Sequence, residues 1–311
     1  MPRMFMLMLA GWLALGQIAS AENHRVESLQ IRILSTMLAD DDGIGEWGFS
    51  ALVEADGHRI LFDTGAHPDT VRRNLRDLRM NLADVRDVIL SHNHIDHTGG
   101  LLTLRNEFPQ SLQRAHAGQG ILLQRGGPNS MTKMKTAYEA GGGKFIEYSQ
   151  PVELYPGVWL TGPVPRKYPE RNWGDRSQVR LPDGTMTEDD IPEDQSLVID
   201  TAKGLVLISG CGHAGVINTL EYARAKVRTA PVHLALGGFH LYNSSDQTLA
   251  WTAAKLKEFG LQNLVGAHCT GVEAVYRLRQ LCGLDRSTAV VGAVGSGFRL
   301  GKGIEPGSIA K

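Results

Sequence analysis

The stretch LSHNHIDHTGG, from Leu90 to Gly100, places three histidines and an aspartate within six residues: His92, His94, Asp96 and His97. It follows an apolar run typical of a buried strand. Side chains two apart in an extended chain point the same way, so His92 and His94 face one space, and a turn can bring Asp96 and His97 to it. A solvated polar loop is the alternative, but four such groups converging without a counter-ion would be costly. The stretch therefore predicts a cation site.

Imidazole nitrogens and a carboxylate suit zinc or a similar divalent metal. Four ligands this close in sequence do not all fit around one ion, so we expect two divalent ions, with zinc favoured over manganese or iron. Further ligands must come from elsewhere in the chain. Glycine neighbours, which let the backbone crowd a site, mark five candidates: His116 in RAHAG, Cys211 and His213 in SGCGHAG, His240 in GGFHL, and His268 in GAHCTG.

Composition limits the class of partner. The chain has 311 residues, 42% of them hydrophobic and 21% charged, which is enough to bury a large core. A formal net charge of −1 and no long basic run give no sign of a nucleic-acid or anionic-membrane surface. We expect a small-molecule substrate, which can be anionic, and no nucleic-acid partner.

The first 21 residues resemble a secretory signal peptide, with Arg3, an apolar run from Met4 to Gly16, and a cleavage site at Ala19–Ala21. A retained anchor or a buried first helix is the alternative. We expect a periplasmic or secreted protein that begins at Glu22 and has no stable membrane span after cleavage.

The cysteines number three, an odd count for an oxidising compartment. At least one of Cys211, Cys269 and Cys282 is then free or metal-bound, and whether Cys269 pairs with Cys282 stays open.

Strand and helix patterns alternate along one domain, residues 22–311. Strands are predicted at 29–34, 49–55 and 58–65, with an Asp-Gly hairpin turn at 56–57, and a helix follows Pro68. Thr98 is a candidate cap for the next helix. The second half predicts strands at 196–200, 204–210, 231–238 and 263–268, separated by helices at 214–227, 245–259 and 271–281. Residues 163–195, rich in proline, glycine and charge, predict a functional loop or lid.

The motifs FDTG, SHNHIDHTGG, GCGHAG and HCTG, in this order, resemble the metallo-β-lactamase superfamily. Together with WGFSALVE and GGFHL they are similar to its branch of dihydropterin ribofuranosylaminobenzene phosphate synthase-like metal-dependent hydrolases. The resemblance implies an α/β fold, an αββα sandwich of two mixed sheets flanked by helices, with the metals at one edge where loops of both sheets meet.

The resemblance also implies a ligand set. His92, His94 and His116 would hold one metal, and Asp96, His97 and His268 the other. Where the family carries a bridging aspartate after strand LVLISG, this chain has Cys211, followed by His213. Cys211 can ligate or bridge, which would favour zinc, or His213 can replace it. A small buried side chain at Cys211 and a structural His213 are the alternatives.

Several further residues carry expectations with a plain structural alternative. Asp63 in LFDTG is expected to orient a ligating histidine, or to cap the turn at Gly65. His240 is expected to contact substrate beside the metals, or to be a structural histidine. Trp47 and Trp173 can wall a pocket, or only anchor packing.

The predicted chemistry is hydrolysis by a metal-activated water that Asp96 helps to orient. The sequence contains no GxSxG motif, the pattern that would indicate a serine nucleophile. A phosphate ester or phosphodiester is the favoured substrate, because the lid is basic: Arg166, Lys167, Arg171, Arg176 and Arg180. The alternatives are a β-lactam or lactone hydrolase, and a non-enzymatic periplasmic zinc-binding or partner-binding protein.

Overall fold

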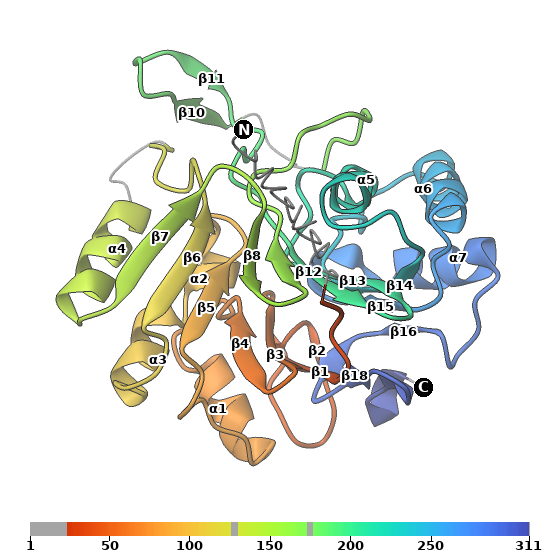
Figure 1. Ribbon diagram of the computed structural model, residues 1–311, viewed down its shortest axis with the longest axis horizontal. Helices are drawn as coiled ribbons and strands as arrows, with labels where there is room; N and C mark the ends of the chain where they lie inside the picture. The colour runs from red at the N-terminus through yellow and green to blue at the C-terminus, as the bar shows by residue number, and fades with distance from the viewer. Residues whose placement is uncertain (1–23, 126–129, 173–176, 311) are drawn as a thin grey trace, which may run out of the picture.

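Two mixed β-sheets lie face to face, with helices on both outer sides (Figure 1). The computed structural model describes residues 24–125, 130–172 and 177–310. The signal-peptide prediction therefore lies outside the described residues, as do Trp173 and Arg176. Within them, no helix is long and apolar enough to cross a membrane.

The first sheet has eight strands, and the three pairings from β4 to β7 are parallel while the others are antiparallel. In spatial order they are β19 (Gly303–Glu305), β18 (Gly297–Arg299), β1 (Leu29–Ser35), β3 (Ser50–Ala55), β4 (His58–Phe62), β5 (Asp87–Leu90), β6 (Arg114–Gly118) and β7 (Lys144–Tyr148).

The second sheet has seven strands, parallel from β13 to β16 and antiparallel elsewhere. In spatial order they are β16 (Ala289–Val291), β15 (Leu264–Gly266), β14 (Val232–Gly237), β13 (Gly204–Ser209), β12 (Leu197–Thr201), β9 (Val158–Leu160) and β8 (Val152–Tyr155). Two small ribbons pair β2 (Leu38–Ala39) with β17 (Ala293–Val294), and β10 (Gln178–Arg180) with β11 (Met186–Glu188).

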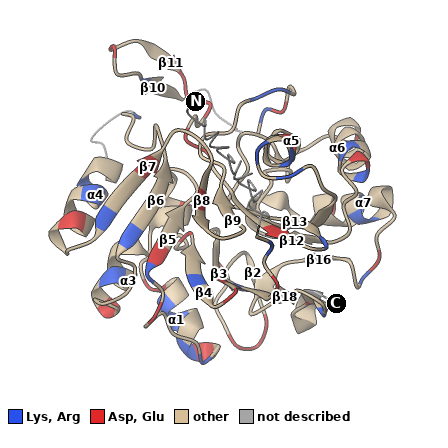
Figure 2. Cartoon of the chain, viewed as in Figure 1, with Lys and Arg blue, Asp and Glu red and all other residues tan. Residues whose placement is uncertain are grey.

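The helices form the outer layers. The first sheet is covered by α1 (Thr70–Asp77), α3 (Leu101–Glu107) and α4 (Ser130–Ala140), and the second by α5 (Val216–Lys226), α6 (Asp246–Glu258) and α7 (Val272–Cys282). Short helices are α2 (Ile95–Thr98), η1 (His268–Thr270) and η2 (Ser308–Ala310). Each of α1 and α3–α7 carries charges of both signs (Figure 2). This arrangement is the expected αββα sandwich.

Alternation along the strands builds the three apolar layers. In β4, Ile60 and Phe62 enter the core between the sheets while Leu61 packs under the helices. In β13 of the second sheet, Val206 and Ile208 enter the same core between the sheets. Side chains that alternate between two buried faces explain why these strands are apolar throughout.

The local predictions near the site are largely confirmed. The Asp56-Gly57 turn has positive φ at both residues, as a two-residue hairpin turn requires, and Ser245 caps α6 by accepting a hydrogen bond from the Thr248 amide. The prediction that Thr98 caps the next helix is wrong, because Thr98 lies inside α2 and its hydroxyl donates a hydrogen bond to the His94 carbonyl.

Candidate metal centre

The site lies where parallel strands of both sheets end. His92 and His94 follow β5, Cys211 and His213 follow β13, His240 follows β14, and His268 follows β15. Loops at the carboxyl ends of parallel strands meet at one edge of the sandwich. Side chains far apart in sequence therefore converge there.

Potential ligand atoms form three overlapping groups, each within 4.8 Å. His92, His94 and His213 form the first. Asp96, His97, Cys211 and His268 form the second, and Cys211, His213 and His240 the third. The third group links the other two, because it shares His213 with the first and Cys211 with the second.

His213 takes the place that the resemblance assigned to His116. The structure does not bring His116 to the cluster, because it sits in the middle of β6, where its Nε2 lies 2.7 Å from Asp87 Oδ1 and its Nδ1 3.0 Å from the Tyr148 hydroxyl. The ring of His213 instead packs against His92, with centroids 4.7 Å apart. The first cluster is therefore built from both sheets.

The expected role of Asp63 agrees with its contacts. One carboxylate oxygen accepts from the Ser91 amide at 2.8 Å. The other lies 2.7 Å from the Ser91 hydroxyl and 2.7 Å from His97 Nδ1. The far nitrogen of His97 then faces Cys211 Sγ at 3.1 Å. Asp63 fixes the orientation and tautomer of His97.

Close packing at this point requires a glycine. A Cβ at Gly210 would lie 2.2 Å from Ser91 Oγ and 2.6 Å from Asp63 Oδ2. The loop after β13 can therefore approach the loop after β5 only because residue 210 has no side chain.

Electrostatics favour metal binding by the cluster of His92, His94 and His213 and by Asp96. Burial lowers the pKa of His94 to about 4 and holds those of His92 and His213 well below the usual range, so these imidazoles are neutral at pH 7. Burial alone would raise the pKa of Asp96, but a hydrogen bond from His268 and nearby histidines lower it, so Asp96 is ionised. Neutral imidazoles and a carboxylate are the forms that bind zinc.

Unpartnered buried atoms give the same indication. The Nε2 atoms of His92 and His213 are buried without a hydrogen-bond partner. Such groups are costly unless something binds them. Because they point into the ligand clusters, the residues present fit divalent metal ions.

The end of the 163–195 segment supports the ligand loops. Glu193 accepts a hydrogen bond from the Asn93 amide, between two ligands, and its other oxygen binds Arg125. Asp194 accepts from the Ala214 amide beside His213, and burial raises the pKa of Asp194 to about 7. Sequence reasoning missed both acids, whose only signal was an acidic pair directly before a strand.

The basic lid prediction finds little support. Lys167 pairs with Glu221, Arg171 with Glu188, and Arg166 with Asp190 at 3.4 Å. Arg180 lies in the β10–β11 ribbon, which projects from the body of the molecule (Figure 1). The three paired cations are already neutralised within the protein.

An open pocket of about 480 Å³ exposes the centre. Its lining includes His94, Asp96, Cys211, His240 and His268 together with Trp47, Tyr242 and His67. Trp47 is 48% exposed and lies edge-on to the His268 ring. Trp47 and His240 thus occupy the pocket positions expected of them, while His67 had no sequence signal.

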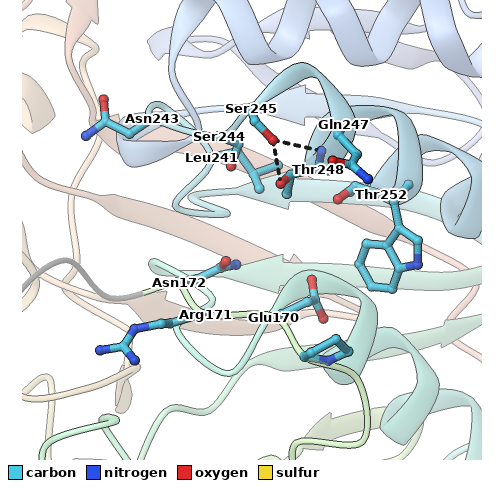
Figure 3. Close-up of a pocket in the computed structure, with 12 residues that line it drawn as sticks. Glu170, Arg171, Asn172, Leu241, Asn243, Ser244, Ser245, Gln247, Thr248 and Thr252 are labelled. Atoms are coloured by element: carbon cyan, nitrogen blue, oxygen red, sulfur yellow. Dashed lines mark hydrogen bonds between the residues drawn. The ribbon is translucent and has the colours of Figure 1, made fainter.

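A second pocket, of about 600 Å³, lies beside the centre. Figure 3 shows Glu170, Arg171 and Asn172 on one wall and the start of α6, with Ser245 and Thr248, on the other. Asn172 connects this pocket to the metal centre. Its backbone carbonyl accepts a hydrogen bond from His213 Nδ1, and its side-chain amide donates to the Gly212 and Phe239 carbonyls.

Comparison with known proteins identifies the family. A model of the metallo-β-lactamase superfamily matches residues 48–255, more than half of the chain. The chain belongs to the metallo-β-lactamase superfamily. Membership of this family implies divalent-metal binding, which agrees with the groups of possible metal ligands in the structure.

This superfamily member is 28% identical over 243 residues to the 7,8-dihydropterin-6-methyl-4-(β-D-ribofuranosyl)-aminobenzene-5'-phosphate synthase of Methanocaldococcus jannaschii, covering 73% of this chain and 82% of that protein. An uncharacterized protein of the same archaeon is 31% identical over 258 residues, covering 81% of this chain and 94% of its own. Among solved structures, Tm1679, a metal-dependent hydrolase of the β-lactamase superfamily, has a TM-score of 0.72 and 28% identity, covering 88% of this chain and 99% of that one. Zn²⁺-bound PqqB from Methylobacterium extorquens shares the fold, with a TM-score of 0.53 and 18% identity over 86% of this chain and 99% of that one.

Proposed function

We propose that this protein is an exported hydrolase that uses two metal ions, zinc in the first instance, to cleave a small phosphate ester or phosphodiester. The observation that carries the proposal is the set of overlapping ligand groups, in which Cys211 and His213 link the group of His92 and His94 to the group of Asp96, His97 and His268. Two ions held this closely would supply an activated water at neutral pH and stabilise charge on the attacked and leaving oxygens.

The residues around the clusters have separate tasks in this proposal. Asp96, ionised and only partly exposed, binds metal and orients the attacking water. Asp63 holds His97 in one tautomer. His240 lines the pocket beside the ligand groups, where its side chain can contact a bound substrate.

The rest of the substrate fits the second pocket. Its wall offers hydroxyl and amide groups and the indole of Trp251, which suits a ring that carries polar substituents. The relative from Methanocaldococcus jannaschii is named for a ribosyl 5'-phosphate compound, and this name supports a phosphorylated small molecule as the substrate class.

A lactone or β-lactam is the second candidate. It is favoured by one observation: among the described residues, the lining of the metal pocket includes no lysine or arginine. An uncharged ring needs no such cation, whereas a phosphate monoester dianion would depend on the metals and on His67 and His240 alone.

The decisive assay loads the purified protein with zinc and measures turnover of aryl phosphodiester, aryl phosphate, lactone and β-lactam substrates. Phosphodiester hydrolysis that is lost in His94→Ala supports the proposal. Turnover of the lactone or β-lactam alone would select the second candidate. Metal binding without any turnover above that of free zinc would leave the storage or partner-binding function. Amino-terminal sequencing of exported protein, with Glu22 first, tests export.

A further inference from the structure

The three cysteines differ sharply in their surroundings. Cys211 and Cys269 are buried, and their sulfur atoms lie 3.3 Å apart. Cys282 lies on α7, where its thiol is 3.8 Å from the Ala253 carbonyl. All three are free thiols, so the Cys269–Cys282 pairing left open by the sequence is not formed. The juxtaposed pair is Cys211 and Cys269.

The backbone holds these two sulfurs together. Cys211 follows β13 and Cys269 lies in η1 after β15, on either side of the end of β14. At that end, a Cβ on Gly238 would lie 2.0 Å from the Gly210 carbonyl and 2.9 Å from Cys269 Sγ. The three loops are therefore packed against one another, and the sulfurs, 3.3 Å apart, need to close only about 1.3 Å to reach the roughly 2.0 Å of a disulfide.

The pair is also accessible to a small reagent. Both cysteines line the open pocket of about 480 Å³, even though little of either side chain meets bulk water. One member of the pair is a candidate ligand, since Cys211 groups with Asp96, His97 and His268. A metal bound there occupies the Cys211 sulfur.

We propose that Cys211 and Cys269 form a reversible disulfide when the metal is absent, and that this bond blocks metal rebinding at the Cys211 cluster. With a peroxide as oxidant, one thiol attacks the peroxide to give a sulfenic acid and one water. The second thiol then displaces a second water to form the S–S bond. Two thiols lose two electrons and two protons, and the peroxide is reduced to two waters. A dithiol reductant restores both thiols.

The pairing itself needs no catalytic activity, but its effect on metal binding rests on the proposed function, in which Cys211 is a ligand. The experiment treats the chelator-stripped full chain with hydrogen peroxide and counts free thiols after denaturation. We expect the count to fall from three to one, and peptide mapping to find the Cys211–Cys269 link. Zinc binding measured with a chromogenic chelator should fall and recover after reduction. Zinc-loaded protein should keep all three thiols.

Two variants make the result specific. Cys282→Ser, the matched control, should lose both remaining thiols and otherwise behave as wild type. Cys269→Ser should keep its two thiols and its zinc binding after peroxide, and Cys269→Ala serves if the serine variant does not fold. Three unchanged thiols in the stripped wild type, or a link through Cys282, would overturn the pairing. A disulfide that leaves zinc binding intact would instead remove Cys211 from the ligand set. The proposed hydrolysis would then still be tested separately, by the turnover assay.

Discussion

Replacing Asp63 with asparagine tests how the metal loop is oriented. The carboxylate accepts three hydrogen bonds, two from Ser91 and one from His97 Nδ1. Asparagine can keep one acceptor, and its NH₂ group would then face the Ser91 hydroxyl and the His97 N–H, which are donors. His97 would have to move its proton to Nε2, the atom that faces Cys211. We expect zinc affinity to fall about 10- to 100-fold.

The matched control is Asp87, the first residue of β5. Asp87 is also a buried carboxylate 2.7 Å from a histidine nitrogen, that of His116, and it also binds Arg114. Each variant loses two or more hydrogen bonds to a buried carboxylate, so both should lower the free energy of unfolding of the metal-free protein by roughly 3 kcal/mol. Only Asp63→Asn should weaken zinc binding.

The assay combines urea unfolding of metal-free protein with zinc competition against a chromophoric chelator. Equal destabilisation with unequal zinc affinity supports the geometry. If Asp63→Asn binds zinc like wild type, His97 is not oriented through Asp63. If Asp87→Asn weakens zinc as strongly, His116 belongs to the metal centre and the assignment of His213 is wrong.

Four further outcomes are expected. His213→Ala should lose metal from the first cluster, as measured by elemental analysis, while His116→Phe keeps it; the reverse pattern would restore the ligand set that the resemblance implied. Chelation should abolish hydrolysis, and zinc should restore it; turnover that survives complete metal removal would exclude the proposed chemistry. Trp251→Ala should raise KM for the preferred substrate more than it lowers kcat, whereas replacement of Tyr276, an exposed side chain of α7 outside both pockets, by alanine should change neither. Equal effects of the two substitutions would remove the second pocket from substrate binding. Burial raises the pKa of Glu170 from 4.5 to about 7, despite hydrogen bonds from the Ile217 and Asn218 amides; the folded state therefore binds the extra proton, and its stability falls as pH rises from about 4.5 to about 7. The free energy of unfolding, measured with urea, should fall by about 1–2 kcal/mol less between pH 5 and pH 8 in Glu170→Gln than in the wild type. An equal fall in both proteins would assign the pH dependence to other groups.

Much of the fold was predictable because each local pattern agreed with the final packing. The strand from Leu29, the turn at Asp56 and the helix capped by Ser245 depend on alternation, turn chemistry and capping, which are local properties. The pairing of β18 with β1 joins strands from opposite ends of the sequence, and no local sequence pattern predicts it. Pairing at that separation depends on the tertiary fold.

The site was predictable to the extent that its ligands share one loop. The group from His92 to His97 is dense enough to predict a cation site, and the structure divides its four residues between two groups of possible ligands. The choice between His116 and His213 depended on where a strand ends. His116 pairs with Ile89 inside the sheet, whereas His213 lies beyond the end of β13. Sequence spacing alone does not reveal that difference.

Gly210 has a consequence for how the sandwich holds together. The contact of its backbone with Ser91 and Asp63 joins the edge of one sheet to that of the other, and the ligands on either side come from both sheets. A bound ion would act as a further cross-link between two halves of the molecule, in addition to the apolar packing and the hydrogen bonds that join them. Adding zinc should therefore slow amide hydrogen exchange at the ends of β5 and β13 together, because opening that seam would first require releasing the ion.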